Sequence, residues 1–271
     1  MSKKVLIGIG VVGILIIVGV GAYVLRPTAE ASAPIEAVPV EVEESAAQES
    51  DDASVKSGSA EDQTGMAVPE SNNVDEMIVV DEPVEEVDTS TSDNFIVFSI
   101  VAAESEVRFT LDELLSGVPT TVVGATDQVA GEIAVDPTAP ANSKVGVIQV
   151  NARTFATDNN FRNRAINNEI LETDEFEFVR FTPTTVTGFP ENPAVGEALE
   201  FQITGNLTIR DITSEVTFDV TVSAVSETRL EGSASTMVAR EDYNLRIPNV
   251  PRVADVDEEV LLEIDFVAVR K

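Results

Sequence analysis

The feature that most limits the fold of this chain is a regular alternation of apolar and polar residues. In VTFDVTVSAV (216–225), Val, Phe or Ala occupies every second position, and Thr, Asp and Ser occupy most positions between them. ALEFQIT (198–204) and LLEIDFVAV (261–269) show the same alternation. A period of two places successive side chains on opposite faces of a β-strand, so these segments predict a sheet with one apolar and one solvated face.

Similar signals recur throughout the chain after residue 94. Further strands are predicted at 95–101, 106–110, 128–135, 144–152, 177–187, 206–210 and 229–239. Only two short helical pieces are predicted, at 111–116 and at about 160–171, the second with Asp158 or Asn159 as its N-cap. Many short strands with so few helices favour an all-β fold, either a sandwich or a barrel.

The chain contains no His and no Cys. The absence of Cys excludes disulfides and thiol chemistry. The absence of His removes the usual zinc ligand and the usual general base near neutral pH. The remaining Asp, Glu, Lys, Tyr and Ser residues form no recognisable catalytic pattern. We therefore expect a protein without enzymatic activity, without a metal site and without a cofactor.

The charge of the chain is strongly negative, with a formal net charge of −31. Residues 27–93 contain 19 acidic residues against a single Lys, and all 12 Phe residues lie after residue 94. Such a segment cannot bury enough apolar surface to offset its ordering entropy, so 27–93 is predicted to be a disordered acidic linker. The charge makes nucleic acid a poor partner. It should also disfavour flat docking of the domain on anionic lipid.

Residues 5–25 are 21 consecutive residues without a charge. A helix of that length spans about 30 Å, the thickness of bilayer hydrocarbon. Because Lys3 and Lys4 precede it, the positive-inside rule predicts a single-pass cell-membrane protein with a cytoplasmic N-terminus and an outer C-terminal domain. A cleaved signal peptide, with ASA (31–33) as its cleavage site, is the alternative. The predicted domains are thus the anchor (1–26), the linker (27–93) and a β domain (94–271).

Three motifs of the predicted β domain resemble the YceI-like, polyisoprenoid-binding domain family. VNARTFATDNNFRNRAI (150–166) looks like its strand–turn–helix signature, and FQITGNLTIRDITSEVTFDVTV (201–222) is similar to its paired central strands. VAREDYNLRIP (238–248) resembles its Arg-x-Asp-Phe-Gly-Leu segment. The residues that carry the resemblance are Thr157, Asn159, Arg162, Gly205, Leu207, Thr208, Ile209, Arg210, Arg240, Asp242, Tyr243 and Leu245. The resemblance covers residues 94–271.

The resemblance implies a lipocalin-like antiparallel β-barrel of about eight strands, with an elongated apolar pocket for an isoprenoid, quinone-like or fatty lipid. It also allows a homodimer. Eight strands leave an interior just wide enough for one slender ligand. Glu104, Asn163 and Asp211 depart from the family pattern, which leaves the recognition of a polar head group open.

Two sets of side chains are candidates for ligand binding. Thr157, Asn159 and Arg162 could rim the barrel mouth and hold a head group, or Arg162 could instead bond backbone carbonyl groups and fix the helix. Inward-facing Phe residues could line a tunnel or fill a core. The complete set of candidates is Phe155, Thr157, Asn159, Arg162, Phe178, Phe201, Ile203, Phe218, Val220, Ile264 and Phe266.

The sequence therefore predicts a membrane-tethered, extracytoplasmic protein that holds a long apolar ligand by burial alone. The alternative is an envelope structural or protein-interaction domain whose barrel is filled and takes no ligand. The two differ in one physical property, which is the free volume inside the sheet.

Overall fold

A computed structural model of the chain describes residues 27–32, 34–41, 95–190 and 196–271. The predicted anchor at 5–25 and residues 42–93 of the predicted linker (27–93) lie outside these ranges, so both stay predictions. None of the helices within the described ranges has the length and apolar character that a bilayer span requires.

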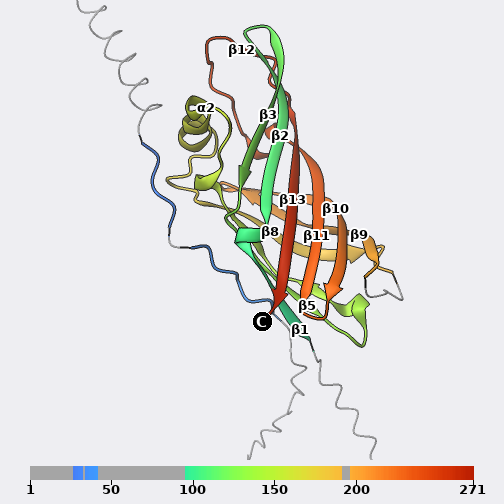
Figure 1. The fold of residues 1–271 in the computed structure, drawn as a ribbon. Coiled ribbons are helices and arrows are strands. Elements are labelled where there is room, and N and C mark those ends of the chain that lie inside the picture. Colours follow the sequence, from blue (N-terminus) through green and yellow to red (C-terminus); the bar gives the residue numbers. More distant parts are fainter. Residues whose placement is uncertain (1–26, 33, 42–94, 191–195) are drawn as a thin grey trace, which may run out of the picture. The chain divides into compact units, whose positions relative to one another are not determined.

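The domain is built on one antiparallel sheet, which curls as in a lipocalin-like barrel (Figure 1). Its 13 strands are β1 (Ile96–Ile100), β2 (Glu106–Leu115), β3 (Val118–Thr126), β4 (Val129–Ala130), β5 (Glu132–Val135), β6 (Lys144–Val145), β7 (Ile148–Asn151), β8 (Phe178–Thr187), β9 (Ala198–Ile209), β10 (Ile212–Ser226), β11 (Arg229–Ala239), β12 (Val253–Ala254) and β13 (Glu259–Arg270). The helical segments are η1 (Ala102–Glu104), η2 (Pro140–Asn142), η3 (Ala152–Thr154), α2 (Asn160–Ala165), η4 (Ile166–Ile170) and η5 (Arg240–Tyr243).

The strand pairing explains the curl. β7, β8, β9, β10, β11 and β13 follow one another across the sheet as neighbours. β13 then pairs with β2 along 261–265 and with β1 along 268–270. β3 pairs with β2, and β5 pairs with β1. β4, which lies between β3 and β5 in the sequence, pairs with β7 at the other end of the strand order. The segment from β3 to β5 therefore completes the curled sheet.

The burial of the strands confirms the alternation predicted from the sequence. On β10, Phe218 and Val220 face the interior, whereas Thr217 and Asp219 are exposed. The largest buried apolar cluster takes side chains from β8, β9, β10, β11, β13 and η5. The core is therefore a lining on the inner face of the sheet.

One of the two predicted helices is confirmed and the other is wrong. Residues 160–170 are helical, as α2 and a turn of π-helix, η4. Residues 111–115 are instead the end of β2, where Leu115 pairs with Val118 across a turn formed by Ser116 and Gly117. Leu and Glu favour a helix locally, but this pairing overrides that weak preference. The sequence pattern does not predict β3, since Pro119 and Gly124 interrupt it.

Residues 27–32 and 34–41 lie against the domain without forming a helix or a strand (Figure 1). The Ser32 backbone N–H donates to Glu177 Oε1 at 2.7 Å, and the Val40 backbone N–H donates to Glu132 Oε2 at 3.0 Å. Burial tends to raise the pKa of Glu177, but hydrogen bonds from Ser32 and Asn151 and the charge of Arg153 together outweigh it, so the pKa of Glu177 is lowered. The acidic composition of this segment did not suggest these contacts, because backbone N–H groups, which nearly every residue carries, supply the donors.

Candidate functional site

The inner face of the sheet lines a cavity of about 1290 Å³. Its wall is made mainly of Phe, Leu, Ile and Val side chains from the long strands, such as Phe201 and Ile203 on β9 and Ile264 and Phe266 on β13. Small-molecule pockets typically measure about 300–1,000 Å³, so this cavity has room for a longer ligand. Because the lining is hydrocarbon, the cavity suits an apolar ligand.

Glycines on the inner face keep aromatic rings close to the wall. Gly124 on β3 pairs directly with Phe109 on β2, and a Cβ atom on Gly124 would come within 2.2 Å of the Phe109 ring. Gly232 on β11 pairs in the same way with Phe266 on β13, where a Cβ atom would lie 2.8 Å from the ring. Each ring therefore occupies the space that a side chain at the glycine would fill.

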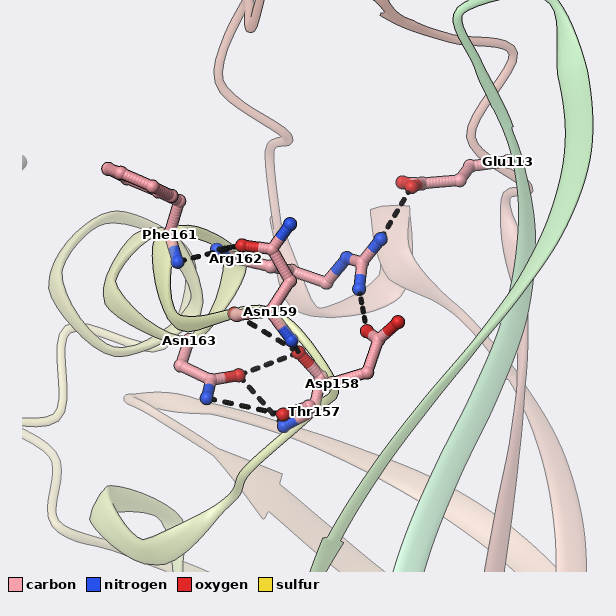
Figure 2. A network of polar contacts seen from close by, with 7 residues as sticks. All are labelled: Glu113, Thr157, Asp158, Asn159, Phe161, Arg162 and Asn163. Atoms are coloured by element: carbon pink, nitrogen blue, oxygen red, sulfur yellow. Dashed lines mark hydrogen bonds and ion pairs between the residues drawn. The ribbon is translucent and has the colours of Figure 1, made fainter.

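The cavity has a polar group of residues where α2 meets β2. Arg162 Nη2 donates to Glu113 Oε1 at 2.8 Å, and Arg162 Nη1 donates to Asp158 Oδ1 at 2.5 Å (Figure 2). Arg162 and Glu113 line the cavity, and Asp158 is exposed. One guanidinium with two carboxylates leaves this cluster with a net negative charge. Within the described ranges, no group of three or more acidic side chains is positioned to hold a metal ion.

Local hydrogen bonds fix the start of α2 and so position Arg162. Asn159 is the N-cap, since its Oδ1 accepts from the backbone N–H groups of Phe161 at 2.8 Å and of Arg162 at 3.3 Å. The backbone N–H and the hydroxyl of Thr157 both donate to Asn163 Oδ1, at 2.8 and 2.7 Å. The ring of Phe161 points away from the ion pair (Figure 2).

Thr157, Asn159 and Arg162 combine parts of the two roles predicted for them. Asn159 and Arg162 line the cavity, as expected of residues at a mouth. Arg162 does fix the helix, but it does so through carboxylates. The predicted bonding to backbone carbonyl groups is instead made by Arg153, whose Nε donates to the Thr173 carbonyl oxygen at 2.8 Å.

The structure brings most of the predicted binding residues to the cavity wall, and two lie elsewhere. Those on the wall are Phe155, Asn159, Arg162, Phe201, Ile203, Phe218, Val220, Ile264 and Phe266. Thr157 is used in the turn before α2. The ring of Phe178 lies 5.4 Å from the Arg180 guanidinium, whereas Val179 and Phe181 line the cavity. The prediction that Phe178 faces the cavity is therefore wrong by one residue. In EFEFVRF (175–181), apolar residues recur at every second position in two registers, one with Phe178 and one with Val179 and Phe181.

One face of β2 lines the cavity although none of its residues was a predicted site residue. Val107, Phe109, Leu111 and Glu113 all line the cavity. A period of two continued from 107 to 113 would have predicted them, including the inward position of Glu113. The expected helix at 111–116 hid this signal.

Tyr243 on η5 was not a predicted site residue, although it also lines the cavity and is fully buried. Burial disfavours its phenolate and raises the pKa of Tyr243 to about 12. By contrast, the three departures from the family pattern do not line the cavity. Glu104 pairs with Arg229 at 2.8 Å, Asn163 accepts the hydrogen bonds of Thr157, and Asp211 is exposed in the turn before β10.

A curled antiparallel sheet around an apolar cavity defines a class of binding domains. The chain belongs to the YceI-like domain family, whose model matches residues 98–268, more than half of its length. UPF0312 protein SA2479 of Staphylococcus aureus (strain N315) is 29% identical over 158 residues, which cover 55% of this chain and 81% of that protein.

A solved structure shows the same fold. A polyisoprenoid binding domain from Saccharophagus degradans, implicated in plant cell wall breakdown, is 15% identical and has a TM-score of 0.51, over 65% of this chain and 99% of that domain. BcnA of Burkholderia cenocepacia is 20% identical with a TM-score of 0.49, over 63% of this chain and 99% of that protein. At this identity, the first of these likenesses supports the fold alone.

Proposed function

We propose that this protein is a membrane-tethered, extracytoplasmic lipid-binding protein. It holds one isoprenoid, quinone-like or fatty chain in the cavity of its β domain and has no chemical step. The tether is the apolar segment 5–25, and the outer location follows from Lys3 and Lys4 at its N-terminal side. The Saccharophagus degradans domain, which has the same fold, is a polyisoprenoid binding domain, and this suggests the class of ligand.

The cavity of about 1290 Å³ is the observation that carries this proposal. A filled barrel, which the alternative function requires, would have side chains that meet across the interior. Instead, the rings of Phe109 and Phe266 lie against glycines on the neighbouring strands. The space between the walls is therefore free for a ligand.

Hydrophobic transfer is sufficient to drive binding of a long chain. Each buried CH₂ group contributes about 0.8 kcal/mol, and association costs roughly 4–15 kcal/mol in lost freedom. A ligand thus needs on the order of ten buried carbons before burial alone gives measurable affinity. Short apolar molecules should bind weakly.

The electrostatics of the polar cluster favour a neutral head group. Arg162 already bonds both Glu113 and Asp158, so its guanidinium is compensated. A phosphate placed there would meet a net negative charge at close range. We therefore expect an alcohol or a quinone to bind more tightly than a phosphorylated chain of the same length.

The proposal is tested by titrating the full chain with an environment-sensitive fluorescent fatty acid and displacing it with a polyprenol. Ala234→Phe and Ser233→Phe are matched variants, because Ala234 lines the cavity and its neighbour Ser233 is exposed. A ring at 234 that displaces about two CH₂ groups of the ligand should weaken binding roughly tenfold. The same ring at 233 should have no effect.

Two results would contradict the proposal. The first is fluorescence that does not saturate or that the polyprenol does not displace. The second is an equal loss in both variants, which would place the probe on the outer surface. Either result would favour a domain that acts through its surface.

A further inference from the structure

Three segments around one end of the cavity contain no acidic residue, a property that they share with a few other stretches such as 137–157. Residues 114–124, 159–168 and 244–254, together called the rim, contain no Asp and no Glu. They contain four arginines, Arg162, Arg164, Arg246 and Arg252. The whole chain has 48 acidic residues against 17 basic ones, so the rim is less acidic than the chain as a whole.

The fold gathers these segments at one end of the sheet. Val253 and Ala254 of β12 pair with Leu115 and Leu114 of β2, which joins the third segment of the rim to the first. The ion pair between Arg162 and Glu113 joins α2 to the same strand. Figure 1 shows α2, β12 and the β2–β3 hairpin at the same end of the domain.

The rim also exposes apolar side chains. Phe161 on α2 is 70% exposed, Val118 at the tip of the β2–β3 hairpin is 61% exposed, and Val250 between η5 and β12 is also exposed. Arg164, Arg246 and Arg252 are exposed beside them. Large apolar groups mixed with arginines are the side chains that insert into the boundary between lipid head groups and acyl chains.

We propose that the rim docks on a membrane surface that carries anionic lipid. Exposed arginines approach the lipid phosphates, and Val118, Phe161 and Val250 enter the interface between them. Glu113, Asp158, Glu169 and Asp255 directly flank the rim segments in the sequence, and the first two are paired with Arg162. The acidic remainder of the domain favours this end-on approach, because charges more than about 8 Å from the membrane are largely screened at physiological salt.

This orientation would bring the cavity to the bilayer. Phe161, Val250 and Arg252 are exposed and also line the cavity, so the cavity reaches the surface within the rim. An apolar chain could then pass between membrane and cavity with little exposure to water. Docking itself follows from the charges and apolar groups of the rim and does not depend on the proposed ligand.

The absence of native Cys permits a direct test on the full chain. Single Cys residues are placed at Val118 in the rim, at Met237 on β11 and at Val225 near the end of β10, which are 61%, 54% and 55% exposed. Each is labelled with an environment-sensitive dye and mixed with vesicles of phosphatidylcholine and phosphatidylglycerol that contain a spin-labelled quencher lipid. Because all three proteins carry the same segment 5–25, any binding through that segment is equal among them.

We expect the dye at 118 to be quenched and to shift to shorter wavelength, with little change at 237 and 225. Replacing Arg164 and Arg246 by Gln should reduce quenching at 118, with a roughly fivefold loss of apparent affinity for each arginine. Neither arginine lines the cavity, so binding of the fluorescent fatty acid should be unchanged. Vesicles of phosphatidylcholine alone should give weaker quenching.

Equal quenching at all three positions, or no quenching at 118, would overturn the proposal. Quenching at 118 that occurs only when the membrane contains a protein, and not with lipid alone, would also overturn the proposal. It would identify the rim as a protein-binding surface. If the protein does not bind the fluorescent fatty acid but the dye at 118 is still quenched, only the function proposed above is refuted. Thermal melts of each variant establish that it is folded.

Discussion

Gly124 and Phe109 form a cross-strand pair on the inner face of the sheet. The Phe109 ring fills the space beside the glycine and makes an edge-to-face contact with Phe155, with ring centroids 5.4 Å apart. An aromatic ring that covers a glycine on the neighbouring strand is a recurrent means of stabilising such positions. Here the same arrangement also keeps the ring flat against the cavity wall.

Gly124→Ala should therefore reduce ligand binding. The new Cβ atom would come within 2.2 Å of the Phe109 ring, and the ring must turn towards the cavity. Displacing about one CH₂ group of the ligand weakens probe affinity roughly fourfold. Adding Phe109→Leu to Gly124→Ala removes the clash and should restore most of the affinity. If the double variant binds no better than Gly124→Ala, the ring is not the cause.

At the scale of elements, one ion pair connects α2 to β2. Arg162 and Glu113 are 49 residues apart in the sequence, and both side chains are largely removed from solvent. The N-cap at Asn159 starts the helix by local chemistry. The contact with Glu113 determines where that helix sits on the sheet.

Arg162→Met should destabilise the fold, because it leaves the Glu113 carboxylate buried without its cation. Loss of one partner of a buried polar pair costs about 1–3 kcal/mol. Urea denaturation measures this change in the free energy of unfolding. Glu113→Gln in the Arg162→Met background should recover part of it, since no buried charge remains. If Glu113→Gln changes the free energy of unfolding of Arg162→Met by as much as it changes that of the native chain, the two side chains do not interact.

The elements show where sequence patterns suffice and where they fail. Period-two alternation placed Phe201, Phe218 and Phe266 on the inner face because each lies in a strand with a single phase of alternation. The pattern failed for Phe178, because β8 alternates in two phases and only pairing with β7 and β9 selects one. The prediction of a helix at 111–116 failed for a related reason. A short segment rich in Leu and Glu is compatible with a helix until a partner strand is present.

At the scale of the molecule, the cavity extends over much of the inner face of the sheet. Its lining includes Arg252 in the rim and also Glu227, which lies in the turn between β10 and β11. A ligand that follows this lining would be a single extended chain. The protein would then meet a membrane end-on, through the combined action of the proposed tether, the rim and the cavity.

Affinity should therefore depend on ligand length in a defined way. Competition of the fluorescent fatty acid by linear alcohols should strengthen about fourfold for each added CH₂ group, because each contributes about 0.8 kcal/mol on burial. The increase should stop once the chain fills the cavity. In Ala234→Phe it should stop at a shorter chain. An affinity that does not change with length would exclude burial of the chain as the source of binding.

The sequence by itself determined that this domain is a β sheet with an apolar face, since alternation with a period of two is a property of neighbouring residues. It also indicated the family, because the motifs at 150–166, 201–222 and 238–248 are local. Only the tertiary structure decided that the interior holds a cavity, because this depends on pairs such as Gly124 with Phe109 that separate strands bring together. It alone gathered the acid-free segments of the rim, which are distant in sequence and meet only when the sheet curls.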